Sequence, residues 1–365
     1  MGRHALKAPR LLLDFIIREW LLIAAVVGLV ATSIQLGRAP RYTIDEITPI
    51  FLLSALFIAV KGIENSRLLV RLGQRLERGG FLPVKLVVIT FALSMVVTID
   101  VSLVTMIPLV LSLNLRQRDH LVILVALTAH VGAALTPFGT PQNLFIFSFY
   151  RIDPLGFILE IAPFSFGMLL VFLLTALFIR TTRVAETTED GVAVDVRRAS
   201  LHGLSLLLAV LCVLRVLPPG FALPAILCPL LFDRDSLRVD YALLATFLCF
   251  IGLAGNIGEL ISAGLRHPHH VFLLSAVLSQ FISNVPSTLL LTPFTGEWKA
   301  LLWGANVGGF GSLVAAMANL ITYKLYAAHR NGNHAAAFML KFILAGYIAF
   351  LLGLGLFFGL KSISS

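Results

Sequence analysis

Apolar stretches long enough to cross a membrane recur along the whole chain, and short polar or charged segments separate them. A helix that spans the hydrocarbon core needs about 20 mostly apolar residues. Stretches near this length occupy residues 19–36, 44–63, 155–180, 199–217, 239–263 and 337–360. The pattern predicts an all-α integral membrane protein with about 9–11 membrane segments, once the interrupted stretches described below are counted.

One apolar stretch, residues 120–150, carries helix breakers at its centre. Pro137, Gly139 and Pro141 stand close together there. Each proline removes a backbone donor and crowds the carbonyl four residues earlier. At membrane depth, freed backbone groups are tolerated only where they face protein or a water-filled cavity. The sequence therefore predicts a transmembrane helix that is broken over residues 136–143.

The chain repeats this arrangement in its second half. An ungapped alignment of residues 129–144 with 305–320 pairs Ala129 with Ala305, His130 with Asn306, Gly132 with Gly308, and Asn143 with Asn319. Residues 94–108 align with 279–293 and pair Ser94 with Ser279, Thr98 with Ser283, and Pro108 with Pro293. Two matched pairs in the same order indicate an internal duplication. Interrupted segments at matching places in two halves are typical of a secondary transporter's binding site.

Residues 82–113 are too long for one crossing and too short for two. Basic residues flank the stretch on both sides, so we expect both ends on the cytoplasmic side and a re-entrant hairpin between them. Its tip is predicted at residues 98–100, where the intramembrane carboxylate of Asp100 would be costly if it faced lipid. Residues 270–295 are predicted to form a second hairpin, with its tip at residues 283–286.

We therefore expect three parts. Residues 1–180 form the first inverted-repeat half, with hairpin 82–113 and broken helix 120–150. Residues 181–198, polar and of mixed charge, form a cytoplasmic linker. Residues 199–365 add one extra helix and then the second half, with hairpin 270–295 and broken helix 299–327. The extra helix turns the second half upside down relative to the first.

Charge supports a membrane location. The chain is 58% hydrophobic and only 13% charged, and its net charge of +9 comes from Lys and Arg concentrated in loops assigned to the cytoplasm. We expect a multi-pass protein of the inner (cell) membrane with a cytoplasmic N-terminus, and no nucleic-acid partner. The basic segment 67–78 is interpreted as an amphipathic helix that anchors the cytoplasmic face, with recognition of anionic lipid or a partner as the alternative.

The sequence lacks the motifs of the enzyme classes we considered. It has no GxxxxGK[ST], HExxH or GxSxG motif, so neither an ATP pump nor a membrane hydrolase is expected, and no cofactor beyond a coupling ion. The three cysteines lie in apolar runs without CxxC spacing and are expected to be buried small hydrophobes.

At ThrIleAsp (98–100), ThrProPheGlyThrProGlnAsn (136–143), SerAsnValProSer (283–287) and AsnValGlyGly (306–309), the chain resembles the ion transporter superfamily with a citrate-transporter-like domain. That group includes divalent anion:sodium symporters, arsenite permeases and sodium/proton antiporters. The resemblance implies a homodimer, with a scaffold part and a mobile transport part in each protomer. It also implies substrate and cation held between the hairpin tips and the broken helices. The second tip keeps the Ser-Asn of the symporter tips but has Val285, whereas the first is closer to the Asn-Asp tip of the arsenite and antiporter branches.

The function expected from these observations is alternating-access transport of a small anion, a carboxylate or an oxyanion, coupled to Na⁺ or H⁺. A sodium/proton antiporter or an arsenite-type efflux permease is the alternative, and an ion channel is a further class. Candidate substrate or ion ligands are Thr98, Asp100, Thr136, Gly139, Thr140, Asn143, Ser283, Asn284, Ser287, Asn306, Gly308, Gly309, Ser312 and Asn319. Candidate Na⁺ ligands among them are Thr98, Asp100, Thr140, Ser283 and Ser312.

Two roles stay open at this point. The asparagines can both donate and accept hydrogen bonds, so they are expected either to brace the broken helices or to contact substrate directly. His130 lies one turn before the first break. It is interpreted as a hydrogen-bonded histidine of the helix bundle, with a proton-sensitive group as the alternative.

Overall fold

The computed structural model describes residues 19–69, 71, 81–112, 118–179, 193–260, 265–329 and 335–363. In the first half the α-helices are α2 (Trp20–Leu36), α3 (Ile44–Asn65), α5 (Leu82–Val96), α6 (Ile99–Ser112), α7 (Arg118–Ala134), α8 (Pro141–Phe149) and α9 (Pro154–Phe178). In the second half they are α10 (Val196–Val213), α11 (Pro224–Phe232), α12 (Tyr241–Leu260), α13 (Pro268–Ile282), α14 (Asn284–Leu291), α15 (Trp298–Val307), α16 (Met317–His329) and α17 (Ala335–Ile363). Short 3₁₀ turns lie at Pro219–Ala222 (η1), Arg234–Leu237 (η2) and Thr292–Phe294 (η3).

Within these ranges the chain is helical and contains no strand; an isolated bridge joins Leu265 to Thr295. Five helical segments are long and apolar enough to cross a membrane: Ile44–Asn65, Pro154–Phe178, Val196–Val213, Arg234–Leu260 and Ala335–Leu360. The predicted fold class, an all-α integral membrane protein, is confirmed. Most of the basic segment 67–78 and most of the linker 181–198 lie outside the described residues.

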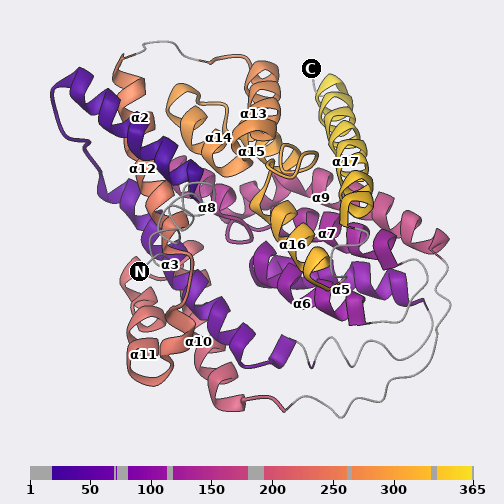
Figure 1. Cartoon of the computed structure of the whole chain (residues 1–365). Helices are drawn as coiled ribbons and strands as arrows, with labels where there is room; N and C mark the ends of the chain where they lie inside the picture. The colour runs from indigo at the N-terminus through magenta and orange to yellow at the C-terminus, as the bar shows by residue number, and fades with distance from the viewer. Residues whose placement is uncertain are drawn as a thin grey trace, which may run out of the picture.

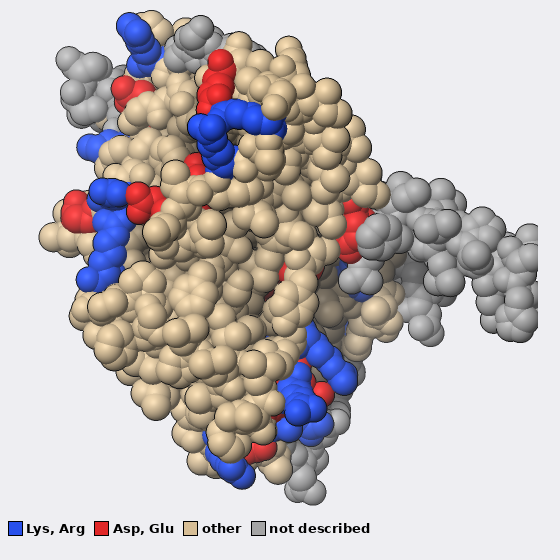
Figure 2. Space-filling model, turned by 90° about the vertical axis from the view of Figure 1, so that its left-hand side faces the viewer, with Lys and Arg blue, Asp and Glu red and all other residues tan. Residues whose placement is uncertain are grey.

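Large apolar side chains are exposed along α2, α9 and α17. Examples are Val27 at 62%, Leu170 at 58% and Leu351 at 63% exposure. Figure 2 shows the side of the molecule that carries α2 and α12: a broad area in its middle is almost free of charge, and Lys, Arg, Asp and Glu lie mostly in its upper part and along its edges. A soluble protein rarely exposes so continuous an apolar surface, whereas lipid tails cover it without cost.

Helix α7 lies at the centre of the molecule, and Figure 1 shows α7 and α8 between α2, α3 and α12 on one side and α17 on the other. Every residue from Leu121 to Ala134 is buried. Helices α5, α6, α9, α15, α16 and α17 all pack against α7. The first broken helix is therefore enclosed by protein, as its freed backbone groups require.

Two helix pairs occupy the stretches predicted to be hairpins. Helices α5 and α6 meet at residues 97–98, and α13 and α14 meet at Ser283. Asp100 lies in the first turn of α6 rather than in the connecting loop. Ser283 has φ 74° and ψ 151°, a conformation that non-glycine residues rarely adopt and that often marks a functional site.

Both predicted broken helices are interrupted in the structure. The first break covers residues 135–140 between α7 and α8, and Pro141 occupies the first turn of α8, where its missing N–H costs nothing. The second break covers residues 308–316 between α15 and α16, and it contains Gly311 with φ 97°. The helices extend one to two residues beyond the predicted limits at 120 and 299, a difference usual for helix ends.

Candidate functional site

Each hairpin tip is hydrogen-bonded to the broken helix of its own half. The N–H of Ile99 donates to the carbonyl of Gly139 (3.1 Å), and the N–H of Asn284 donates to the carbonyl of Ala315 (2.9 Å). The alignment of the two halves pairs Ile99 with Asn284 and Gly139 with Ala315. The two bonds are therefore equivalent, and each holds a tip beside a break.

A second pair of equivalent bonds joins the same segments. The hydroxyl of Thr136 donates to the carbonyl of Met95 (3.3 Å), and that of Ser312 donates to the carbonyl of Gln280 (3.1 Å). The alignment again pairs Thr136 with Ser312 and Met95 with Gln280. These contacts support the duplication inferred from the sequence.

Two equivalent asparagines close the loops of the breaks. The amide nitrogen of Asn143 donates to the carbonyls of Ala134 (3.0 Å) and Thr136 (3.3 Å). The amide nitrogen of Asn319 donates to the carbonyls of Gly309 (3.0 Å) and Ser312 (2.9 Å). The structure thus shows the bracing role that the sequence left open for these asparagines, because their amides satisfy carbonyls freed by the interruption.

The two halves also contact each other through these two asparagines and through a second aligned pair, His130 and Asn306. Asn306 donates from its amide nitrogen to Asn143 Oδ1 (2.9 Å), and His130 Nε2 lies 3.0 Å from Asn319 Oδ1. Since His130 aligns with Asn306 and Asn143 with Asn319, each half contributes the same two positions to the other. Such reciprocal contacts are characteristic of two units related by a twofold axis.

Glycines allow the hairpins to approach the broken helices closely. A Cβ on Gly132 would collide with Ser94 Oγ and the carbonyl of Phe91, and a Cβ on the equivalent Gly308 would lie 2.6 Å from Ser279 Oγ. Ser94 and Ser279 are themselves an aligned pair. Any side chain at either glycine would push the arm of the hairpin away from the helix it packs on.

The predicted ligands gather around these tips and breaks. All of them are buried except Asp100 and Ser312, which are half-buried. The side chain of Ser287 donates to the carbonyl of Ser275 (3.2 Å), and that of Asn284 donates to the carbonyl of Ala305 (3.3 Å). Both are therefore engaged by protein, in the same way as Asn143 and Asn319.

Two hydroxyls beside the first tip and break have no hydrogen-bond partner among the described residues. Within the described part of the chain, Ser102 Oγ and Thr140 Oγ1 are fully buried and unpaired. Ser102 lies one helical turn after Ile99, and Thr140 directly follows Gly139. Since Ile99 and Gly139 are hydrogen-bonded to each other, both hydroxyls belong to the first tip and break. A buried polar group without a partner costs about 1–3 kcal/mol, so a ligand is a natural explanation.

Sequence reasoning missed Gln280, which fills the second break. Its amide nitrogen donates to the carbonyls of Gly308 (2.9 Å) and Phe310 (3.0 Å), and its Oε1 accepts from the N–H of Ser312 (3.1 Å). The only sequence signal was a long polar side chain directly before a hairpin tip, where the first half has Met95. Ser102 was missed for a simpler reason: serine is common in apolar helices, and its lack of a partner shows only in three dimensions.

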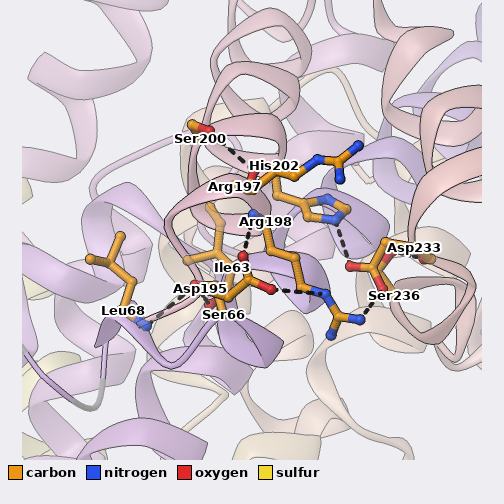
Figure 3. A network of polar contacts seen from close by, with 10 residues as sticks. All are labelled: Ile63, Ser66, Leu68, Asp195, Arg197, Arg198, Ser200, His202, Asp233 and Ser236. Atoms are coloured by element: carbon orange, nitrogen blue, oxygen red, sulfur yellow. Dashed lines mark hydrogen bonds and ion pairs between the residues drawn. The ribbon is translucent and has the colours of Figure 1, made fainter. Parts of the chain in front are cut away.

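A second buried polar cluster lies away from the breaks and was not predicted (Figure 3). His202 on α10 is fully buried, and its Nε2 lies 2.9 Å from Asp233 Oδ2. Arg198 stands between Asp233 (3.6 Å) and Asp195 (3.4 Å). Gly62 on α3 makes room for the imidazole, since a Cβ there would overlap the ring. The cluster therefore fastens α10 and the α11–η2 connection to α3. Among the described residues, none of its hydrogen bonds or ion pairs reaches a hairpin tip.

A membrane protein whose interrupted helices and hairpin tips meet at its buried centre has the architecture of a transporter. The chain belongs to the citrate transporter family, whose model matches residues 14–297. It is 32% identical over 327 residues to "Uncharacterized transporter MJ0456" of Methanocaldococcus jannaschii, covering 86% of this chain and 88% of that protein. It is 31% identical over 300 residues to "Inner membrane protein YbiR" of Escherichia coli K12, covering 76% and 79% of the two chains. The protein is therefore a multi-pass membrane transporter.

Proposed function

We propose that the chain transports a small anion, a carboxylate or an oxyanion, by alternating access coupled to Na⁺ or H⁺. The observation that carries this proposal is the convergence of four helix N-termini. Helices α6, α8, α14 and α16 all begin at the two tips and the two breaks, which the bonds described above hold together. Helix N-termini carry partial positive charge and free amides, which suit the oxygens of an anion.

A small apolar cavity beside the tips and breaks supports a moving part. A cavity of about 20 Å³ lies between α3 and α12 on one side and α8 and α14 on the other. Pro49, Phe247, Pro141 and Val285 are among the residues that line it. The cavity is too small for a carboxylate substrate and is lined by apolar side chains. Binding therefore requires the two pairs of helices to separate, and we assign α3 and α12 to the scaffold and α8 and α14 to the transport part.

The coupling ion is proposed to bind in the first half, at Thr98, Asp100 and Thr140. The unpaired Thr140 hydroxyl and the half-buried Asp100 carboxylate are oxygen ligands of the kind that hard cations prefer. Ser283 and Ser312, the candidate Na⁺ ligands of the second half, are less available, since the Ser312 hydroxyl already donates to Gln280. Asp100 also keeps the alternative open, because a carboxylate in the membrane is equally suited to a sodium/proton antiporter or an arsenite-type permease.

The surroundings proposed for this activity are the inner (cell) membrane, with a cytoplasmic N-terminus and a homodimeric assembly. The apolar surfaces of α2, α9 and α17 support contact with lipid or with a second copy. The excess of Lys and Arg in the loops assigned to the cytoplasm supports the orientation.

Counterflow in proteoliposomes tests the proposal. Purified protein would be reconstituted with unlabelled succinate, citrate, sulfate, phosphate or arsenite inside, and the uptake of the same labelled compound would be measured. We expect one of the anions to show counterflow and to require Na⁺ or a low external pH for concentrative uptake. Counterflow of none of them, in liposomes where the protein is shown to be folded and inserted, would contradict anion transport. Na⁺/H⁺ exchange or single-channel currents in the same liposomes would support the antiporter or the channel instead.

A further inference from the structure

The two bonds that join the halves are equivalent in position but not in chemistry. The amide nitrogen of Asn319 donates to two backbone carbonyls, so its Oδ1 faces His130 and can only accept. The contact of 3.0 Å therefore requires a proton on His130 Nε2. In the neutral imidazole, Nδ1 then carries a lone pair and no proton.

His130 Nδ1 faces the second break. A Cβ built on Gly309 would lie 3.3 Å from this nitrogen and 3.0 Å from the amide nitrogen of Asn284 at the second hairpin tip. No side chain or backbone group in the described ranges is hydrogen-bonded to Nδ1. Because Gly309 has no side chain, a donor nitrogen from the tip and an acceptor nitrogen from α7 approach the same point, which also lies 3.3 Å from the carbonyl oxygen of Asn306. An anion oxygen therefore reaches the two nitrogens only when the tip moves away from the break. The position equivalent to Gly309 in the first half is Ala133, which carries a methyl group.

No ionised neighbour fixes the charge of this imidazole. The titratable side chains on the described parts of the helices packed against α7 are Lys85 on α5, Asp100 on α6, Glu160 on α9, Lys299 on α15, Tyr323, Lys324, Tyr326 and His329 on α16, and Lys341 and Tyr347 on α17. Glu160 contacts Trp303 and Lys299, whereas Tyr326 and Lys341 contact Asp119 at the far end of α7. None of these groups forms a hydrogen bond or ion pair with His130 in the structure. An anion bound beside Gly309 would be the nearest opposite charge.

We propose that His130 is the anion-binding group whose protonation at Nδ1 accompanies substrate binding. In the protonated ring both nitrogens donate, so Nε2 keeps its bond to Asn319 while Nδ1–H donates to an anion oxygen beside Gly309 and Asn284. One proton is taken up at Nδ1 when the anion binds and is released when the anion leaves. The equivalent Asn306 offers only a permanently neutral amide, so one half alone carries this proton. The inference rests on the proposed anion transport and adds a proton-linked contact to it.

The first test follows the histidine itself. The full-length protein, labelled with ¹⁵N-histidine and held in nanodiscs, would be titrated by NMR between about pH 5 and pH 8, with His130→Gln identifying the resonance. We expect the Nε2–H tautomer at high pH, and a protonation midpoint that moves upward when succinate or sulfate is added. The Nδ1–H tautomer, or a midpoint that neither anion moves, would overturn the proposal.

The second test measures the linkage through binding. Sulfate keeps its charge across this pH range, so any pH dependence of its binding comes from the protein. We expect sulfate to bind more tightly at pH 5 than at pH 8, by up to about tenfold, because an adjacent opposite charge that raises a pKa by about one unit strengthens binding by at most that factor. In His130→Gln the amide nitrogen replaces Nε2–H toward Asn319, so the fold is retained while the contribution of His130 to the pH dependence of sulfate affinity is lost. Equal pH dependence in the wild type and His130→Gln would overturn the role of His130, whereas counterflow of no anion at any pH would count against the proposed function itself.

Discussion

The first and second breaks share one frame of hydrogen bonds but are filled differently. In the second, Gln280 satisfies the carbonyls of Gly308 and Phe310, and the hydroxyl equivalent to Ser102, that of Ser287, is paired. In the first, Met95 replaces Gln280, and the hydroxyls of Ser102 and Thr140 are buried without partners. The protein therefore satisfies the polar groups of the second break with Gln280 and leaves two hydroxyls beside the first break without partners.

The difference indicates how a duplicated unit can support two tasks. The reciprocal bonds between His130 and Asn319 and between Asn306 and Asn143 keep the halves in one relative position. Within that frame a substitution in one half alone changes its chemistry while the other half keeps the fold. We accordingly assign the coupling ion to the first tip and break and the anion to the space beside the second break, where His130 from the first half reaches across.

Removing the Asp100 carboxylate of the first half should have the largest effect on transport. Asp100→Asn should abolish gradient-driven uptake, because the neutral amide can neither release a proton nor attract a cation. Folding should be intact, since the side chain is only half-buried. Uptake driven by imposed Na⁺ and pH gradients in proteoliposomes measures the effect.

Asp153→Asn is the matched control for Asp100→Asn. Asp153 caps α9 by accepting from the N–H of Gly156, and asparagine caps helices equally well. The control should transport normally. Undiminished uptake by Asp100→Asn would remove the coupling ion from the first half.

The next effect in size tests the packing that the two halves have in common. Gly132→Ala should cost about 3 kcal/mol, near the upper end for overpacking, because the new methyl group meets the backbone of Phe91 as well as Ser94. Gly308→Ala should cost less, because its obstacles lie farther away: Ser279 Oγ at 2.6 Å, the carbonyl oxygen of Gly304 at 2.7 Å and Ser279 Cβ at 2.8 Å. Gly203→Ala is the control, since nothing lies within 4 Å of its Cβ position. Thermal unfolding in detergent gives the ranking, and a Gly132→Ala protein as stable as Gly203→Ala would contradict the close packing.

The fold class and the positions of the interrupted helices could be predicted from the sequence, because they depend on residues with strong local effects on the backbone. Pro137, Gly139 and Pro141 together interrupt a helix more strongly than one proline does, since Pro49 and Pro108 lie inside α3 and α6. A polar tip inside an apolar stretch of limited length must form a turn. The fold class could therefore be predicted, and the interrupted segments were placed to within two residues of their observed limits. The alignment also paired Asn143 with Asn319 and His130 with Asn306. In the structure these four positions form the contacts between the halves, Asn306 with Asn143 and His130 with Asn319.

The remaining features depend on packing that no local pattern encodes. Asp233 could not be assigned to His202, because the pair forms only when α10, α3 and the α11–η2 connection come together. The role of Gln280 likewise depends on where the second break folds back. Whether an asparagine braces a loop or binds a ligand is decided by the carbonyls within reach of its amide, and these become known only in the folded chain.

Exchanging the residue that differs between the halves should have a moderate effect. Gln280→Met gives the second half the residue of the first and leaves the buried carbonyls of Gly308 and Phe310 without their side-chain donor. We expect a loss of about 1–3 kcal/mol in stability. Gln280→Glu keeps the shape but loses both donors, so it should be destabilised at least as much. Stability equal to wild type in both variants would show that the second break does not depend on Gln280.

The smallest expected effect separates a ligand site from a packing defect in the first break. Thr140→Val removes a buried hydroxyl that has no partner, so in the absence of Na⁺ the variant should be as stable as wild type or more stable by up to about 1 kcal/mol. Ser102→Ala should behave in the same way. Ser287→Ala is the matched control, because it removes a paired hydroxyl and should destabilise the protein by roughly 1 kcal/mol.

If these hydroxyls bind the coupling ion, adding Na⁺ should reverse the order of stability of the variants. Wild type and Ser287→Ala should be stabilised by Na⁺ relative to K⁺, whereas Thr140→Val and Ser102→Ala should gain little, because a ligand that binds only the folded state raises stability in proportion to its affinity. Thermal shifts of the four proteins in matched Na⁺ and K⁺ buffers measure this. If Thr140→Val destabilises the protein in both salts, the hydroxyl has a partner in the folded state and the first break is as self-contained as the second. If all four proteins respond to Na⁺ alike, the cation binds elsewhere or the coupling ion is H⁺, and the two breaks differ for another reason.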